Sequence, residues 1–239
     1  LIPDPPPLLF VTGDADVLAK PDTVAIVGTR QATEQGLETA KDLAAQLVKH
    51  GFVVVSGLAL GIDTAGHEGA LANGKTIAVL ATPLDRIYPA SNRDLASRIH
   101  SNGVLVSEYP LGAATSRWAF VARDRIQSGL SIGVIPVQTD VDGGTMHTVG
   151  FAEKQGRLVS CPAPPVGTEH VPAYRGVAEL LRSRRAEAFE STGIDVLAEN
   201  LRAHRKRITG QDAQPVEVAN KDDGAELAQS TFLPTDGTQ

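Results

Sequence analysis

The chain has 239 residues, 42% of them hydrophobic, and a formal net charge of −6 at pH 7. This length allows one well-packed core with an appendage, and no window approaches the ~20 consecutive apolar residues that a membrane-spanning helix needs. Cys161 is the sole cysteine, which excludes disulfides within the chain and cysteine-cluster metal sites, so we expect a soluble protein of the reducing cytoplasm.

The N-terminal segment, residues 1–23, contains the proline-rich stretch PDPPPLLFVTGD. Proline is unfavourable inside helices and central strands, so we predict an extended lead-in that packs on the edge of the domain. The sole methionine is Met146, and we therefore expect that Leu1 is not the natural start of the protein.

From residue 24 onward, apolar β-branched runs alternate with segments of helical period. The predicted strands are residues 24–27, 53–55, 77–80, 104–106, 132–137 and 158–160, and the predicted helices between them are residues 34–50, 64–72, 93–100, 118–127 and 146–154. Strands that are apolar on both faces and alternate with helices indicate a mostly parallel sheet with helices on both faces. The predicted fold is an extended Rossmann-like α/β domain over residues 24–172.

The positions of glycines at helix ends and the composition of the C-terminal segments complete the prediction. Glycines fall where helices should end in left-handed caps, at Gly51, Gly74, Gly103 and Gly156. Two more helical stretches, 177–188 and 194–205, predict a short helical extension over residues 173–208. The polar, acidic residues 209–239 are expected to form a disordered tail.

Charge is unevenly distributed along the chain. Between residues 86 and 125 the sequence holds Arg86, Arg93, Arg98, Arg117, Arg123 and Arg125 against only three carboxylates. A local basic patch on a mildly acidic protein is compatible with phosphate binding. An ordinary solvated surface is the alternative reading, and charge alone leaves both open.

The loops after the predicted strands carry the chemistry, because ligands of open α/β sheets lie beyond the carboxyl ends of the strands. These loops read GTR, SGLALGID, ATPLDRIYP, SEYPLG and DGGTMHT. Glycine lets backbone amides approach a ligand closely, a helix start at Thr145 favours an anion, and Arg30 offers a planar fork of donors. The loops therefore predict a phosphate-rich ligand, although neither a dinucleotide nor a P-loop fingerprint is present.

In this order, the motifs VAIVGTR, VVSGLALGID, LDRIYP, GVLVSEYP, RDRI and DGGTMHT resemble those of the DNA-processing protein A (DprA/Smf) family. The resemblance covers about residues 3–164. It implies a Rossmann-like domain that binds single-stranded DNA, forms homodimers and helps to load the RecA recombinase during natural transformation. It implies no catalysis, cofactor or metal, and we place the dimer contact at the late edge of the sheet, residues 131–161.

The same resemblance carries the family's basic residues onto Arg30, Lys75, Arg123 and Arg125, with a nearby aromatic matched by Phe120. Phe120 either stacks a base or packs in the core. The set predicted to bind phosphate combines these cations with the glycine loops: Gly28, Arg30, Ser56, Gly57, Gly61, Lys75, Arg123, Arg125, Gly143, Gly144 and Thr145.

The sequence also departs from the family pattern. Asp124 stands where the family has asparagine, Pro83 where it has glycine, Gln138 where it has glutamate, and Gly143 where it has serine. A carboxylate between two arginines neutralises part of a phosphate site, or it orients the arginines and leaves a usable pocket. Residues 177–207 show no strand pair, so a winged-helix domain is not predicted there.

Two alternative functions remain open. DGGTMHT is also similar to the glycine-rich loop of lysine-decarboxylase-like (LOG) nucleotide hydrolases, but Thr148 stands where those enzymes carry glutamate. Acid or base candidates for such an enzyme are Asp63, Asp85, Glu108 and His67, each of which also has a simpler role as a cap, turn or helix residue. The third possibility is a sensor that binds a nucleotide without changing it.

Overall fold

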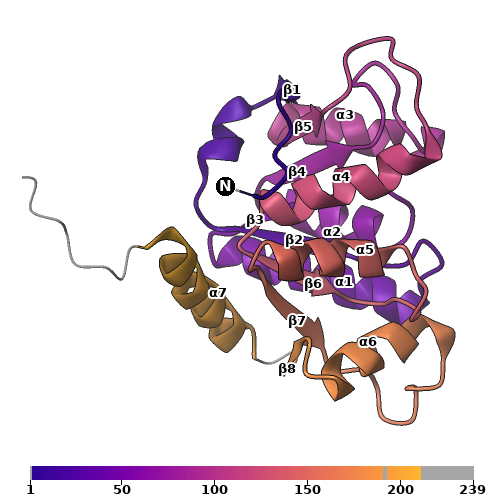
Figure 1. Cartoon of the computed structure of the whole chain (residues 1–239), viewed down its shortest axis with the longest axis vertical. Helices are drawn as coiled ribbons and strands as arrows, with labels where there is room; N and C mark the ends of the chain where they lie inside the picture. The colour runs from indigo at the N-terminus through magenta and orange to yellow at the C-terminus, as the bar shows by residue number, and fades with distance from the viewer. Residues whose placement is uncertain (1, 191–192, 211–239) are drawn as a thin grey trace, which may run out of the picture.

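The computed structural model describes residues 2–190 and 193–210, and in this part of the chain the strands form one eight-stranded sheet (Figure 1). Their order in the sheet is β1-β5-β4-β3-β2-β6-β7-β8. The strands are β1 (Phe10–Gly13), β2 (Thr23–Val27), β3 (Val53–Ser56), β4 (Thr76–Leu80), β5 (Val104–Ser107), β6 (Gly133–Pro136), β7 (Leu158–Pro162) and β8 (Glu187–Phe189). All neighbouring pairs are parallel except β1 with β5.

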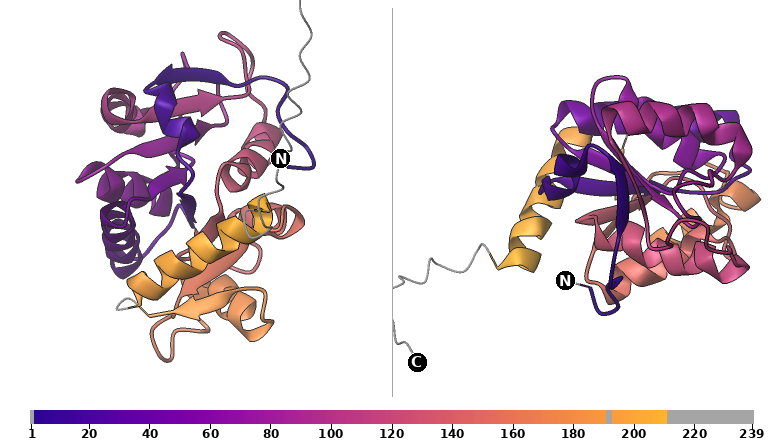
Figure 2. Two further views of the ribbon diagram at one scale, coloured as in Figure 1. Left: turned by 90° about the vertical axis from the view of Figure 1, so that its left-hand side faces the viewer. Right: turned by 90° about the horizontal axis from the view of Figure 1, so that it is seen from above.

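The helices cover both faces of this sheet, as Figure 2 shows from two further sides. They are α1 (Glu34–Lys49), α2 (Ile62–Leu71), α3 (Arg93–Asn102), α4 (Arg117–Gly129), α5 (Thr145–Lys154), α6 (Pro172–Arg182) and α7 (Ile194–Thr209), with short 3-10 turns η1 (Ala15–Ala19) and η2 (Ala90–Asn92). Leu47 of α1 and Leu201 of α7 pack on one face, and Ile126 of α4 and Val177 of α6 pack on the other. The predicted Rossmann-like fold is confirmed.

The lead-in forms β1, which pairs antiparallel with β5 in the register Phe10 with Ser107. It therefore occupies one edge of the sheet, as predicted. The opposite edge differs from the prediction. The helix expected at 177–188 is α6, which starts earlier, at Pro172, and ends at Arg182. Proline is favourable in the first turn of a helix because its missing N–H would have no partner there. The chain then forms β8, which pairs parallel to β7.

Two of the four expected left-handed glycine caps are present. Gly51 (φ 82°) and Gly156 (φ 64°) adopt this conformation, whereas Gly74 and Gly103 do not. Gly103 is extended, and a Cβ on it would lie 2.3 Å from the carbonyl oxygen of Thr76. Its role is the close approach of two strands rather than a helix cap.

The predicted tail begins within the described residues only at Thr209, which ends α7, and Gly210, its left-handed cap; residues 211–239 lie outside them. None of the helices in the described part of the chain is long and apolar enough to cross a membrane.

Candidate functional site

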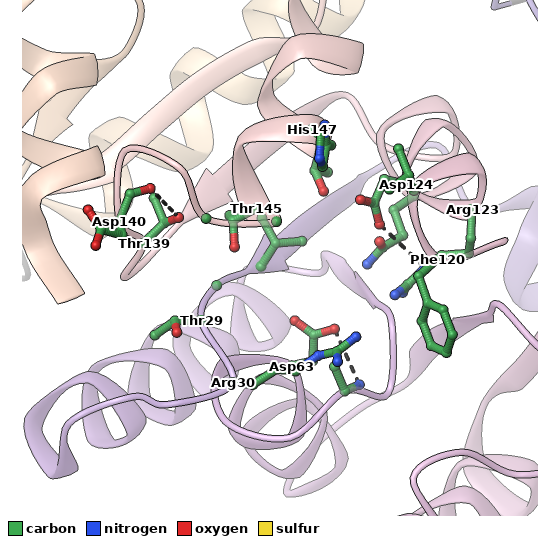
Figure 3. A pocket seen from close by; sticks show the side chains of 18 of the residues that line it. Thr29, Arg30, Asp63, Phe120, Arg123, Asp124, Thr139, Asp140, Thr145 and His147 are labelled. Carbon is green, nitrogen blue, oxygen red and sulfur yellow. Dashed lines mark hydrogen bonds and ion pairs between the residues drawn. The ribbon is translucent and has the colours of Figure 1, made fainter. Parts of the chain in front are cut away.

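A pocket of about 510 Å³ opens at the carboxyl edge of the sheet, where β2 and β6 are neighbours. The strand order reverses at this pair, since β3 follows β2 on one side and β6 lies on the other. Such a switch point is the usual ligand site of an open α/β sheet. The polar residues of the lining are Thr29, Arg30, Gln31, Asp63, Arg123, Asp124, Gln127, Thr139, Asp140, Thr145, His147 and Thr148. Figure 3 labels most of them.

The glycine loops meet in this pocket as the sequence predicts. Gly28, Gly143 and Gly144 line it, and α5 begins on its rim at Thr145. The amides of Met146 and His147 donate to the carbonyls of Gly143 and Gly144, so within the described residues the amides of Gly144 and Thr145 are the ones left available to an anion. A Cβ on Gly144 would touch nothing within 4 Å, which leaves this part of the loop open to a ligand. Gly61 has a φ of 77°, and its missing side chain lets the loop approach the Thr29 carbonyl.

Arg30 is the exposed cation of the pocket. It follows β2, and its guanidinium carbon lies 5.5 Å from the ring centroid of Phe120. It forms no ion pair with any carboxylate in residues 2–190 and 193–210. Phe120 is half-buried on the pocket wall and so belongs neither to the core nor wholly to solvent. Arg30 is therefore free to bind an incoming anion.

Arg123 lies deeper, between two carboxylates. Its side chain is 6% exposed, its Nη1 donates to the carbonyl of Val79 at 3.0 Å, and its Nε lies 3.4 Å from Oδ1 of Asp124. The second carboxylate, Asp63, is buried and accepts from the amides of Gly57 at 3.1 Å and Ala59 at 3.4 Å. Asp63 thus holds the SGLALGID loop against the start of α2.

Burial sets the protonation of these two carboxyls. It raises the pKa of Asp63, and it raises the pKa of Asp124 to about 6, with the nearby Arg123 opposing the shift. Asp124 is thus ionised at neutral pH and offsets part of the Arg123 charge. Asp124 also contacts Arg123 directly. The carboxylate can therefore both neutralise part of the Arg123 charge and orient its guanidinium, so the two interpretations of aspartate at this position are compatible.

Two of the four predicted cations lie away from the pocket. Lys75 precedes β4 at the amino edge of the sheet and pairs with Asp14. The hydrogen bond from Lys75 holds the pKa of the Asp14 carboxyl below its usual range. Arg125 is 8% exposed, and it binds Glu108 through Nη1 at 2.9 Å and the carbonyl of Asp4 through Nε at 3.0 Å. Of the four cations, only Arg30 and Arg123 share the pocket, so the pocket does not bring the predicted set together, and a joint role of all four in binding one strand stays a prediction.

Of the remaining predicted residues, Ser56 is fully buried and donates to the carbonyl of Ile26 at 2.7 Å, so it supports the sheet rather than lining the pocket. Gly57 lines a neighbouring notch beside Arg123. Sequence reasoning missed Thr139, Asp140 and His147 in the lining. Their signal was present, because the first two lie in the loop that follows β6 and the third lies in the first turn of α5.

The acid and base candidates for catalysis are engaged in structural contacts. His67 is fully buried, its Nδ1 lies 2.8 Å from the hydroxyl of Thr76, and burial lowers its pKa to about 3. Asp85 accepts from the amide of Gly112 at 3.1 Å, and Glu108 pairs with Arg125. No group of three metal-ligating side chains is found among the residues that the structure describes.

Comparison with known proteins gives a consistent result. The family model described as DNA recombination-mediator protein A matches residues 1–201. Protein Smf of Synechocystis is 43% identical over 169 residues, which are 69% of this chain and 42% of that protein. DNA processing protein DprA of Bacillus subtilis is 42% identical over 157 residues, 65% of this chain and 53% of that protein. The chain thus spans about half the length of these curated relatives.

Solved structures agree. DNA processing protein A from Helicobacter pylori, described for its single-stranded DNA binding mode, superposes with a TM-score of 0.76 and 33% identity over 83% of this chain and 90% of that one. DprA from Streptococcus pneumoniae superposes with a TM-score of 0.73 and 37% identity over 81% of this chain and 66% of that one. A molybdenum cofactor carrier protein from Chlamydomonas reinhardtii, at 18% identity and a TM-score of 0.51, shares the fold alone. The chain therefore belongs to the DNA recombination-mediator protein A family, whose curated members are named DprA and Smf.

Proposed function

We propose that this chain binds single-stranded DNA and acts as a recombination mediator without catalysis. The observation that carries the proposal is the pocket at the β2–β6 switch point, where Arg30, which forms no ion pair within the described residues, lies beside glycine loops and the start of α5. The description of the Helicobacter relative, which concerns single-stranded DNA binding, supports this choice of ligand.

In the proposed complex, Arg30 contacts a backbone phosphate, and the amides near Gly144 and Thr145 supply fixed donors. Arg123 is too buried to reach far, so it contributes positive potential from the pocket floor and Asp124 reduces that potential. Contacts to phosphate carry no sequence information, and we expect little dependence on base sequence.

The proposal extends to partners and location. We place the protein in the cytoplasm, as a homodimer that cooperates with a RecA-type recombinase. The dimer contact needs one revision: β6 lies between β2 and β7, and β7 is covered by β8, so strand pairing through residues 131–161 is blocked. A dimer through this edge of the sheet would have to use β8 or the helices beside it.

A nucleotide hydrolase of the LOG type is less well supported. Such an enzyme needs an acid or base free to move a proton at the reacting atom. Of the acid and base candidates drawn from the sequence, His67 lies outside the pocket lining, and Asp63, which lines it, is held by two loop amides. Asp124 and His147 also line the pocket, so base release is assayed directly in the experiment below. A non-catalytic nucleotide sensor stays the alternative outcome of the experiment below.

The test is a titration of fluorescently labelled single-stranded oligonucleotide across a series of salt concentrations. We expect log K to fall linearly with log salt, with a slope of about −0.7 for each phosphate contacted. Nucleoside monophosphate is titrated in parallel and assayed for base release. Tight monophosphate binding with no oligonucleotide binding would favour the sensor, and base release would favour the hydrolase.

A further inference from the structure

An exposed tyrosine lies beside the pocket. Tyr88, in the loop between β4 and α3, is 52% exposed. Its ring packs against that of Phe120, with centroids 5.4 Å apart and planes at 69°. Phe120 in turn lies under the guanidinium of Arg30, at 5.5 Å. These three side chains, from three different loops or helices, form one continuous row, which we call the Tyr88–Phe120–Arg30 row.

The row borders a shallow notch next to the phosphate pocket. Leu60, itself 44% exposed, and Gly57 also line the notch, and Arg30, Phe120 and Arg123 line both the notch and the pocket. A ligand held at the pocket by Arg30 therefore has an apolar, aromatic surface within reach on its other side.

The chemistry of the row matches a nucleotide within a flexible strand. A half-exposed aromatic ring offers a flat apolar surface, which every nucleobase can stack on, and the neighbouring guanidinium offers a bidentate contact to phosphate. Duplex DNA does not offer this combination, because its bases are already stacked inside the helix. A single strand can turn one base outward while its backbone stays on the cation.

We propose that Tyr88 is a base-stacking residue: one nucleobase lies on the Tyr88 ring while the adjoining phosphate is held by Arg30. This inference rests on the proposed function and adds to it a subsite that reads the presence of a base rather than its identity. It separates the two parts of the interface, since the glycine pocket takes phosphate and the row takes the base.

The experiment compares two labelled strands of equal length and charge, oligo-dT and an abasic oligonucleotide. Tyr88→Leu is expected to raise the Kd for oligo-dT about tenfold, within the range measured for loss of one stacked base, and to leave the Kd for the abasic strand within about twofold of the parent value. Tyr88→Phe keeps the ring and should bind both strands like the parent. The matched control is Tyr109→Leu, which removes a tyrosine outside the pocket lining.

Arg30→Ala should weaken both strands, because the phosphate contact does not depend on the base. A Tyr88→Leu variant that weakens both strands alike, or neither, overturns the stacking assignment and leaves the proposed function intact. Failure of the parent to bind oligo-dT at all overturns both.

A second measurement needs no variant. Oligonucleotide carrying 5-iododeoxyuridine is irradiated in complex with the parent protein, and the crosslinked peptide is identified by mass spectrometry. Attachment at Tyr88 supports the proposal, and attachment confined to other residues contradicts it.

Discussion

The guanidinium of Arg123 fills the space that a side chain at position Gly57 would need: a Cβ on Gly57 would lie 1.4 Å from Nη1 of Arg123. The loop after β3 thus has no side chain at the point where the guanidinium of α4 enters the fold. In that position Arg123 reaches the Val79 carbonyl and stays next to Asp124.

Gly57→Ala should therefore displace Arg123 rather than strain the loop backbone. Loss of a charged hydrogen bond predicts a decrease in the free energy of unfolding of about 1–3 kcal/mol, measurable by urea denaturation. In an Arg123→Ala background the same change should cost little, because the clash is gone, so the two effects are not additive. Gly150→Ala is the control, since a Cβ there meets nothing within 4 Å. Full additivity in the double variant would show that the two residues do not compete for space.

Asp124→Asn should change the pH dependence of stability. Burial raises the pKa of Asp124 in the folded protein to about 6, above its ordinary value, so the folded state holds this proton more tightly than the unfolded chain. The ionised carboxyl therefore lowers stability progressively from about pH 4 to pH 6 and by a constant amount above that. Relative to the parent, Asp124→Asn should gain roughly 2 kcal/mol in the free energy of unfolding between pH 4 and pH 7. A difference that does not vary with pH would show that the carboxyl has its ordinary pKa.

The same variant should bind oligonucleotide more tightly at neutral pH, because it removes a negative charge from the phosphate pocket. Parent affinity should rise as pH falls through about 6, and the variant should lose that part of the response. His147 also lines the pocket, so His147→Gln is the matched control. If Asp124→Asn keeps the full pH response of the parent, the Asp124 carboxyl is not the group that sets it.

Arg30→Ala and Lys75→Ala should differ in salt dependence. Arg30→Ala is expected to flatten the slope of log K against log salt by about 0.7, since one phosphate contact is lost. Lys75 sits at the far edge of the sheet in an exposed pair with Asp14, so Lys75→Ala should leave the slope for a short oligonucleotide unchanged. A larger change for Lys75→Ala than for Arg30→Ala would move the phosphate site to the amino edge.

Arg125→Ala should reduce stability rather than affinity. Arg125 is 8% exposed and joins α4 to Glu108 and to the lead-in, so its loss leaves a carboxylate without its partner. We expect a cost of about 3–5 kcal/mol in the free energy of unfolding and an unchanged salt slope. Asp4→Ala is the comparison, because Asp4 is 85% exposed and a surface pair contributes about 0–1 kcal/mol. An altered slope in folded Arg125→Ala would return this residue to the DNA interface.

The sequence predicts the sheet well because parallel strands buried on both faces require apolar runs such as VVVS in β3 and TIAVL in β4. The edge strand β8 cannot be predicted in this way, since it has three residues and two of them are exposed. No hydrophobic pattern can develop over so short a segment. Pro172 was the usable signal for the start of α6.

The site is predicted in part, and the errors have physical causes. Loops after parallel strands share an edge, which correctly gathers Gly28, Arg30 and Gly144. The same rule places Lys75, which precedes its strand, on the other edge, but motif order along the chain hides this. Arg123 and Arg125 are two residues apart on a helix and so point about 200° apart, which is why only one enters the pocket.

Both outermost strands of the sheet come from outside the segment of alternating strands and helices. β1 belongs to the lead-in and covers β5, and β8 belongs to the C-terminal extension and covers β7. A fragment of residues 24–172 would keep the phosphate pocket. It would lack β1 and β8, and so it would expose the backbone donors and acceptors of β5 and β7 that pair with those two strands. Such edges recruit strands from other molecules. The two flanking segments therefore protect β5 and β7 from pairing with strands of other molecules, and any shortened version of this protein should retain them.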